Sequence, residues 1–292
     1  MKRSLFITAS LAALASPRFA RARTPIDDLL RPAILSIPGN VGIYARTMAN
    51  GPALYAYNAN VSFPSASTIK MLIMLTAFKT AERDPSVMRK RIRFHAEELI
   101  GGSDFMQNAS DGDVFTVHEL IVPMIQVSDN TASNMLISHF GFDLINTITQ
   151  RAGLRQTYLR RHFLDTAAVL HHMDNRTTPA DMARLLYQLE RGTREGVPTV
   201  ASPISCRRMI DIMLGQTDRD TIPKLLPHGV AVANKTGELS RSRSDVAIVD
   251  PFGDSPYVLA VYTSGLDAPG QAYDGIARIS RAIYGRVAGT DL

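Results

Sequence analysis

Strand-like segments lie at both ends of this chain and helix-like segments fill its middle, which limits how the chain can fold. Val41–Met48 and Ala53–Asn60, joined by a turn at Asn50-Gly51, read as strands, as do Val230–Lys235, Ser244–Val249 and Tyr257–Ser264 near the end. A sheet built from them must pair residues from opposite ends of the sequence. We therefore predict an antiparallel sheet flanked by helices, with an all-α lobe beside it: an α/β (α+β) fold.

Helical periodicity dominates the chain between these two groups of strands. The predicted helices are Ser67–Glu82, Val117–Gln126, Thr131–Phe140, Phe142–Ala152, Pro179–Arg191 and Pro203–Gln216, and a last helix, Gln271–Tyr284, closes the chain. The first of them has a mostly apolar stripe, and Ser65 or Ser67 could cap it. A single domain, residues 23–292, would then have a sheet lobe (26–62 and 228–292) and a helical lobe (63–227), with a cleft between them.

Three short motifs follow one another along the chain: Ser67-Thr68-Ile69-Lys70, Ser128-Asp129-Asn130 and Lys235-Thr236-Gly237. Alone, each has an ordinary structural interpretation: a helix cap with a solvated lysine, a second helix cap, and a strand that ends in a turn. Together, with the first on a helix and the last on a strand, they supply two serines, two lysines and an asparagine. That is the set of groups from which one acyl-transfer site can be assembled.

A serine hydroxyl is a poor nucleophile at neutral pH unless a nearby base takes its proton. Ser67 and Lys70 are three residues apart, which places them on one face of a helix. Lys70 is a base only when neutral, and lowering its pKa by about 3 units costs roughly 4 kcal/mol. Burial, the helix N-terminus and a second cation, Lys235, act in that direction. We therefore expect Lys70 and Lys235 to converge on the Ser67 hydroxyl.

With these motifs the chain resembles class A β-lactamases and their penicillin-binding relatives. The resemblance includes the run into the first motif, Phe63–Lys70, and Ser128–Asn134 at the start of a helix. Thr177–Pro179 resembles the end of the family's omega loop, and Met213–Gly237 resembles its approach to the last motif. The resemblance covers most of the mature chain and implies the class A β-lactamase fold for a catalytic domain of residues 23–292.

The resemblance also implies a role for each motif residue. Ser67 would be the acylated nucleophile, with Lys70 as its base or proton relay. Ser128 would pass a proton to the leaving nitrogen. Asn130 would hold Lys70 and a substrate amide, or have a structural role as well.

Further residues are implied to bind the substrate. Lys235 and Thr236 would hold its carboxylate, and the backbone N–H groups of Ser67 and of Glu238, which follows Gly237, would form the oxyanion hole. Either Arg241 or Arg243 could also reach the carboxylate. The alternative is that both arginines are ordinary solvated strand residues.

One family residue is missing. Active class A β-lactamases need an omega-loop glutamate that activates the water for hydrolysis of the ester. Counting back without gaps from Thr177–Pro179 places the expected glutamate within Arg160-Arg161-His162-Phe163, where there is none. The only carboxylates between Arg160 and Pro179 are Asp165 and Asp174. Asp165 is either a substitute base or an ion-pair partner of Arg160 or Arg161. His162 titrates in a useful range but is as readily a surface residue. Acylation is expected, and hydrolysis of the ester stays open.

Three functions are compatible with these residues. The leading one is an exported serine β-lactamase, which confers antibiotic resistance by hydrolysing β-lactams through an acyl-Ser67 intermediate. The second is a penicillin-binding D-alanyl-D-alanine carboxypeptidase or endopeptidase, where an absent omega-loop glutamate would be natural. The third is a non-turnover β-lactam-binding protein. The related serine glutaminases share the first motif, but the two later motifs argue against them.

Residues 1–22 have the pattern of a secretory signal peptide: a basic start at Lys2-Arg3, a short apolar run, and a cleavage site at Ala20-Arg21-Ala22. We therefore expect a secreted or periplasmic protein without stable membrane insertion; a retained anchor is the alternative. The formal net charge of +5 comes almost entirely from this segment. The mature chain is close to neutral, so a nucleic-acid partner has no electrostatic support.

The single cysteine, Cys206, lies within a predicted helix and is expected to be buried, so no internal disulfide can form. The histidines and Cys206 do not have zinc-binding spacing, and we expect neither a metal nor another cofactor. The expected substrate is a small-molecule β-lactam or a peptidoglycan peptide, and the expected state is a monomer.

Overall fold

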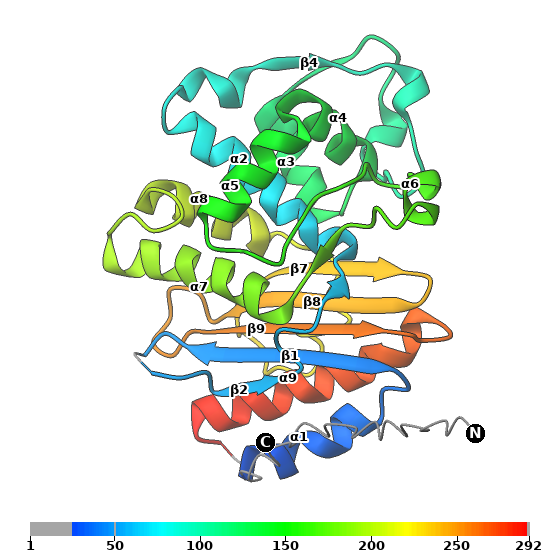
Figure 1. Cartoon of the computed structure of the whole chain (residues 1–292). Coiled ribbons are helices and arrows are strands. Elements are labelled where there is room, and N and C mark those ends of the chain that lie inside the picture. Colours follow the sequence, from blue (N-terminus) through cyan, green and yellow to red (C-terminus); the bar gives the residue numbers. More distant parts are fainter. Residues whose placement is uncertain (1–24, 50, 291–292) are drawn as a thin grey trace, which may run out of the picture.

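The computed structural model describes residues 25–49 and 51–290, and its centre is one antiparallel sheet (Figure 1). The strands lie in the order β2-β1-β9-β8-β7, and every neighbouring pair is antiparallel. Their bounds are β1 Asn40–Thr47, β2 Tyr55–Tyr57, β7 Val232–Leu239, β8 Ser242–Val249 and β9 Tyr257–Ser264. The prediction of a sheet assembled from both ends of the sequence is therefore confirmed, and β1 pairs with β9 along its whole length.

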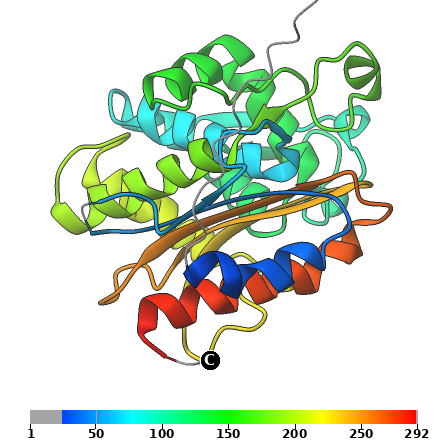
Figure 2. The same ribbon diagram turned by 60° about the horizontal axis from the view of Figure 1, so that its bottom comes forward.

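Helices cover both faces of this sheet (Figure 2). On one face lie α1 (Pro25–Leu35) and α9 (Tyr273–Ala288), and α7 (Pro179–Glu195) and the helical lobe lie on the other. The interior strand β8 is buried at every residue. The side chains of its apolar half enter two separate cores, one on each face of the sheet. One core lies between the sheet and the helical lobe, and the other lies under α1 and α9.

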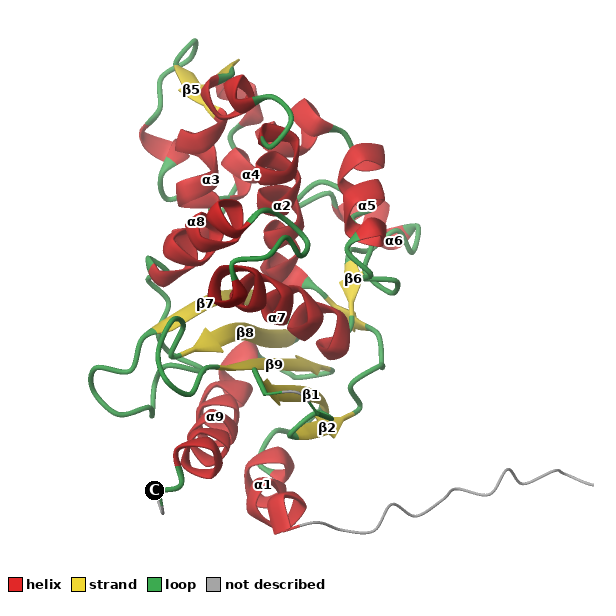
Figure 3. Ribbon diagram, turned by 90° about the vertical axis from the view of Figure 1, so that its left-hand side faces the viewer, coloured by secondary structure: helices red, strands yellow, loops and turns green. Residues whose placement is uncertain are grey.

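The helical lobe is built around α2, whose residues from Lys70 to Phe78 are all buried (Figure 3). The other helices of this region are α3 Val117–Gln126, α4 Asn130–Phe140, α5 Phe142–Arg151, α6 Thr166–Leu170 and α8 Pro203–Leu214. Two short ribbons complete it, β3 Phe63–Pro64 with β6 Arg176–Thr177, and β4 Arg91–Arg93 with β5 Val114–Thr116. Cys206 is fully buried in α8, as predicted.

Several predicted boundaries were wrong. The helix expected from Ser67 begins instead with a 3-10 turn, Ala66–Ile69, before α2 (Lys70–Ala81), and the Ser65 side chain makes no capping bond. The strand expected over Ala53–Asn60 is reduced to β2. Helix α1 was not predicted, because Pro32 inside it argues against a helix on sequence grounds. The expected turn at Asn50-Gly51 falls partly on Asn50, which lies outside the described residues.

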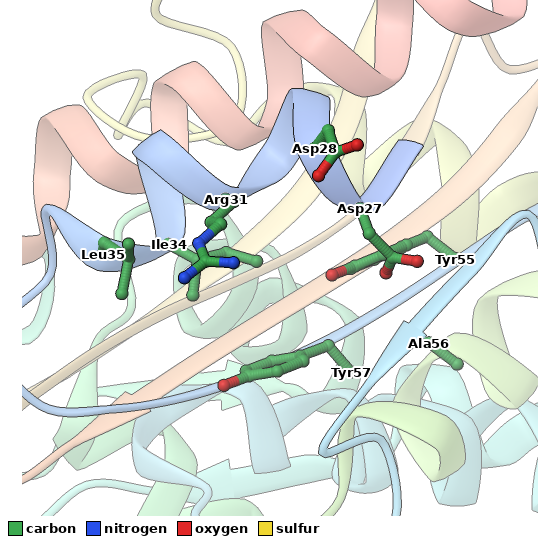
Figure 4. Close-up of a pocket in the computed structure, with 8 residues that line it drawn as sticks. All are labelled: Asp27, Asp28, Arg31, Ile34, Leu35, Tyr55, Ala56 and Tyr57. Carbon is green, nitrogen blue, oxygen red and sulfur yellow. The ribbon is translucent and has the colours of Figure 1, made fainter. Parts of the chain in front are cut away.

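A hollow of about 390 Å³ lies between α1 and the edge strand β2 (Figure 4). Its walls carry Arg31, Ile34 and Tyr57 and none of the predicted site residues, so it is separate from the candidate site described below. Within residues 25–49 and 51–290, no helix is long and apolar enough to cross a membrane. The predicted signal peptide, residues 1–22, lies outside the described part of the chain.

Candidate functional site

Ser67 lies in the 3-10 turn that leads into α2, at the point where this turn meets β7 (Figure 1). Ala66, directly before it, has a left-handed backbone with φ +46°, which is strained for a residue with a Cβ atom. Gly237 allows the close approach, because a Cβ at that position would lie 3.0 Å from the Ala66 Cβ. Local strain of this kind concentrates at functional sites. The strand β7 thus lies directly against the turn that carries Ser67.

Lys70 is fully buried, and its Nζ contacts the second motif. It donates to the Ser128 carbonyl at 2.5 Å and to Asn130 Oδ1 at 2.8 Å, and it lies 3.2 Å from Ser128 Oγ. A neutral lysine amine has two N–H donors and one lone pair. The two carbonyl oxygens can accept both N–H groups, which leaves the lone pair for a hydroxyl proton.

Lys235 reaches the same hydroxyl from β7. Its Nζ lies 3.0 Å from Ser128 Oγ and donates to the Thr236 carbonyl at 2.9 Å. The two lysines therefore converge on Ser128, whereas we had expected them to converge on Ser67. Among the described residues no hydrogen bond joins Ser67 Oγ to either amine, although Ser67 and Asn130 line the same cavity. The second motif is thus the centre of the polar cluster, and Ser67 lies at its edge.

Burial is the main cause of the altered basicity of both lysines. It lowers the pKa of Lys70 well below the ordinary value, and the nearby charge of Lys235 lowers it further, while Asp129 opposes the change. Burial also lowers the pKa of Lys235 to about 7, although Asp245 and Asp218 oppose it. Lys235 is therefore partly neutral near neutral pH, which ordinary lysines are not, and the pKa of Lys70 is shifted in the same direction.

The second motif is held rigidly by Asp129. Its carboxylate caps α4 by accepting from Ala132 N at 2.8 Å and also accepts from Met106 N at 2.9 Å. Ser128, like Ala66, has a left-handed backbone, with φ +61°. Asn130 Nδ2 donates to the Gly101 carbonyl at 2.9 Å, so the amide that binds Lys70 is fixed at both ends.

The loop from Arg160 to Thr178 closes one side of the cavity. A salt bridge between Arg161 and Asp174, with Nη2 and Oδ1 2.7 Å apart, joins its two arms. The side chain of Asn134, in α4, accepts from Phe163 N at 2.8 Å and donates to Phe163 O at 3.2 Å. This places the Phe163 ring centroid 4.4 Å from Lys70 Nζ.

Phe163 therefore occupies the loop position that faces the lysine, and an aromatic ring cannot activate water. Sequence reasoning located Phe163 in the loop but missed its contact with Lys70. It also missed the role of Asn134, which stands one helical turn after Asn130 on the same helix. That spacing was the available signal.

The expected partners of Asp165 were wrong. Arg161 pairs with Asp174, and among the described residues Asp165 forms no salt bridge with Arg160 or Arg161. Asp165 instead caps α6 by accepting from Ala168 N at 2.9 Å, and it lines the cavity that contains Ser67. His162 lies elsewhere, with Nε2 3.3 Å from Ser138 Oγ and its ring against Phe142.

The end of the site expected to bind a carboxylate contains carboxylates of its own. Arg243 is buried and pairs with Asp218 at 2.5 Å and with Glu238 at 2.9 Å. Arg241 is exposed. The Tyr273 ring lies 4.5 Å from the Arg243 guanidinium. Neither Asp218 nor Tyr273 was identified from the sequence, because both come from segments outside the three motifs.

The loop, the turn that carries Ser67 and the end of β7 surround a cavity of about 460 Å³. Its lining combines Ser67 and Asn130 with Glu238 and with apolar side chains of the loop, Phe163, Leu164, Val169 and Leu170. It is large enough for a small amide or lactam, and its lining contains both polar and apolar groups. Among the described residues no cluster of three or more His, Cys, Asp or Glu side chains could hold a metal ion.

Comparisons with known proteins agree with this fold. A β-lactamase from Sphaerobacter thermophilus superposes with a TM-score of 0.79 at 25% identity, over 91% of this chain and 98% of that one. PBP-A superposes with a TM-score of 0.78 at 26% identity (90% and 96%), and an ancestral class A β-lactamase with 0.78 at 25% identity (89% and 99%). The model of the Beta-lactamase enzyme family matches residues 23–287. The chain therefore belongs to the β-lactamase enzyme family.

Proposed function

We propose that this protein is a serine hydrolase that opens β-lactam rings by forming an ester on Ser67, and that it releases the ester slowly. The convergence of Lys70 and Lys235 on Ser128, beside Ser67, carries the proposal. Lys70 takes the Ser67 proton as Oγ attacks the lactam carbonyl. The C–N bond then breaks, Ser128 gives its proton to the leaving nitrogen, and Lys70, 3.2 Å from Ser128 Oγ, passes the proton taken from Ser67 on to Ser128. Lys235 lies 3.0 Å from Ser128 Oγ and stabilises the negative charge that develops there.

Slow release follows from the contact between Phe163 and Lys70. Hydrolysis of the ester needs a water molecule and a base beside it. The centroid of the Phe163 ring lies 4.4 Å from Lys70 Nζ, so the loop presents an apolar surface where the water and the base would be needed. The nearest loop carboxylate, Asp165, is engaged as the cap of α6.

The same contact favours a second candidate, the penicillin-binding D-alanyl-D-alanine peptidase. Such an enzyme uses the same acylation residues but does not need to hydrolyse a β-lactam ester quickly. PBP-A, which this chain resembles, has been solved as an acyl-enzyme complex with penicillin G in its leucine-to-glutamate variant, so a similar protein forms such an ester. Release of D-alanine from a peptide that ends in D-alanyl-D-alanine tests the peptidase activity directly.

Time-resolved intact mass spectrometry after addition of benzylpenicillin tests the main proposal. We expect the mass of benzylpenicillin to be added to the protein faster than it is lost, so that the adduct accumulates. Ser67→Ala should gain no mass, which controls for attachment elsewhere. Absence of any adduct on the wild-type protein would refute acylation, and turnover without an accumulated adduct would refute slow release.

A further inference from the structure

The positive end of the cavity is already neutralised by the protein itself. Each terminal nitrogen of Arg243 donates to a carboxylate: Nη2 to Asp218 at 2.5 Å and Nη1 to Glu238 at 2.9 Å. Its guanidinium also lies against the Tyr273 ring. Because Arg243 is buried, an entering ligand can reach it only past these partners. A substrate carboxylate could bind Arg243 only in competition with these protein groups.

Glu238 stands between the cavity and Arg243. The two residues are direct cross-strand neighbours on β7 and β8, so their side chains share one face of the sheet. The Glu238 side chain is 43% exposed and lines the same cavity as Ser67. Tyr273 OH donates to Glu238 Oε2 at 2.6 Å, which holds the carboxylate in place. The position that an incoming carboxylate would occupy therefore already contains one.

The neighbouring donor also has a carboxylate close by. Thr236 lies on the same face of β7 as Glu238, and its hydroxyl lies near Asp218. Burial alone would raise the pKa of Asp218, but the charge of Arg243 and the hydrogen bonds that Asp218 accepts from Arg243 and from Asp220 N outweigh burial and lower the pKa. Asp218 is therefore charged at neutral pH. Two carboxylates surround a single guanidinium, and a third would be repelled.

We propose that Glu238 is a specificity-determining residue that makes this site select acyl donors without a carboxylate at the Arg243 position. The inference rests on the proposed function, since it concerns which substrates acylate Ser67. The favoured class is esters and amides that are neutral there, such as an internal peptide bond whose leaving segment continues beyond this point. Donors that end in a free carboxylate there are disfavoured.

Benzylpenicillin and its methyl ester provide a matched pair that differs in this one charge. Acylation rates for both are measured by intact mass on the wild-type protein and on Glu238→Gln. We expect the wild type to react with the methyl ester at least as fast as with the acid. Glu238→Gln should raise the ratio of the acid rate to the ester rate about tenfold, because the competing charge is gone.

Two further variants keep the test decisive. Tyr273→Phe retains the ring over Arg243 but releases Glu238, and it should raise the same ratio about twofold to threefold. Asp220→Asn removes a negative charge from the exposed loop beside Asp218 without touching Arg243, and it should leave the ratio unchanged. An equal ratio in wild type, Glu238→Gln and Tyr273→Phe would overturn the role of Glu238. Failure of both compounds to acylate any variant would instead refute the proposed function.

Discussion

The buried amine of Lys235 should make the wild-type protein less stable at pH 7 than a variant that lacks it. Its pKa of about 7 lies well below the ordinary lysine value of 10.5. Since the unfolded chain binds a proton more tightly than the folded one, holding Lys235 costs the folded state roughly 4 kcal/mol at pH 7. Lys235→Met removes this cost, and it also removes the hydrogen bonds to Ser128 and Thr236, worth about 1 kcal/mol each. The variant should thus be more stable at pH 7 by roughly 2 kcal/mol.

This advantage should disappear as the pH rises. Between pH 7 and pH 9 the folded protein loses the Lys235 proton while the unfolded chain keeps it. The wild type therefore gains roughly 2 kcal/mol relative to the variant. By pH 9 the two proteins should be about equally stable. The charge of Lys235 also lowers the pKa of Lys70, so the variant is relieved of this repulsion at pH 7, and that gain too fades as Lys235 becomes neutral toward pH 9.

Urea unfolding at pH 7 and at pH 9 measures this difference directly, as two free energies of unfolding per protein. Lys79→Met is the matched control, because the Lys79 side chain is 40% exposed and its salt bridge, within the described part of the chain, is with Glu82. We expect this control to show the pH dependence of the wild type. If the difference between wild type and Lys235→Met is the same at both pH values, Lys235 keeps an ordinary pKa and the argument fails.

Three other predictions concern the cavity loop and the core. Phe163→Glu should speed release of the penicilloyl ester at least tenfold relative to the isosteric control Phe163→Gln, measured by the decay of the adduct mass. Equal decay in the two variants would show that a base at this position is not what release lacks, and decay equal to that of the wild type would show that the ring is not the obstacle. Asp165→Asn should keep the cap of α6 and release the ester within twofold of the wild-type rate, because Asn and Asp cap helices about equally well; a much slower release would make Asp165 the base. Burial raises the pKa of the Cys206 thiol, so it should not react with a thiol reagent at pH 8 until urea unfolds the protein, and rapid labelling of the native protein would contradict its burial.

The sheet could be predicted from the sequence because its strands are apolar runs of ordinary length. Val117–Gln126 and Tyr257–Ser264 were predicted with the bounds that the structure shows. Helix α1 was missed because Pro32 lowers local helix propensity, whereas packing of Leu30 and Ala33 against the sheet stabilises it. Local propensity was outweighed there by burial, which a single sequence does not display.

The candidate site was predictable as a set of residues but not as a network. The motifs identified Ser67, Lys70, Ser128 and Lys235, yet not which hydroxyl the lysines contact, since that depends on side-chain rotamers in a packed interior. The contact of Phe163 with Lys70 was equally hidden, because it depends on how Asn134 holds the loop backbone. Contacts between segments distant in sequence leave no periodic signal, and these contacts are the ones that set the chemistry.

The pairing of β1 with β9 has a consequence for how the protein forms. The first strand of the sheet acquires its central partner only when residues near the end of the chain are available. Long-range pairing of this kind slows folding, because a long loop must close before any contact stabilises it. The strand that carries Lys235 is connected to β1 only through β8 and β9, so the cleft between sheet and helical lobe depends on β9 being in place. A chain cut short before Tyr257 should carry all three motifs and still have no working centre.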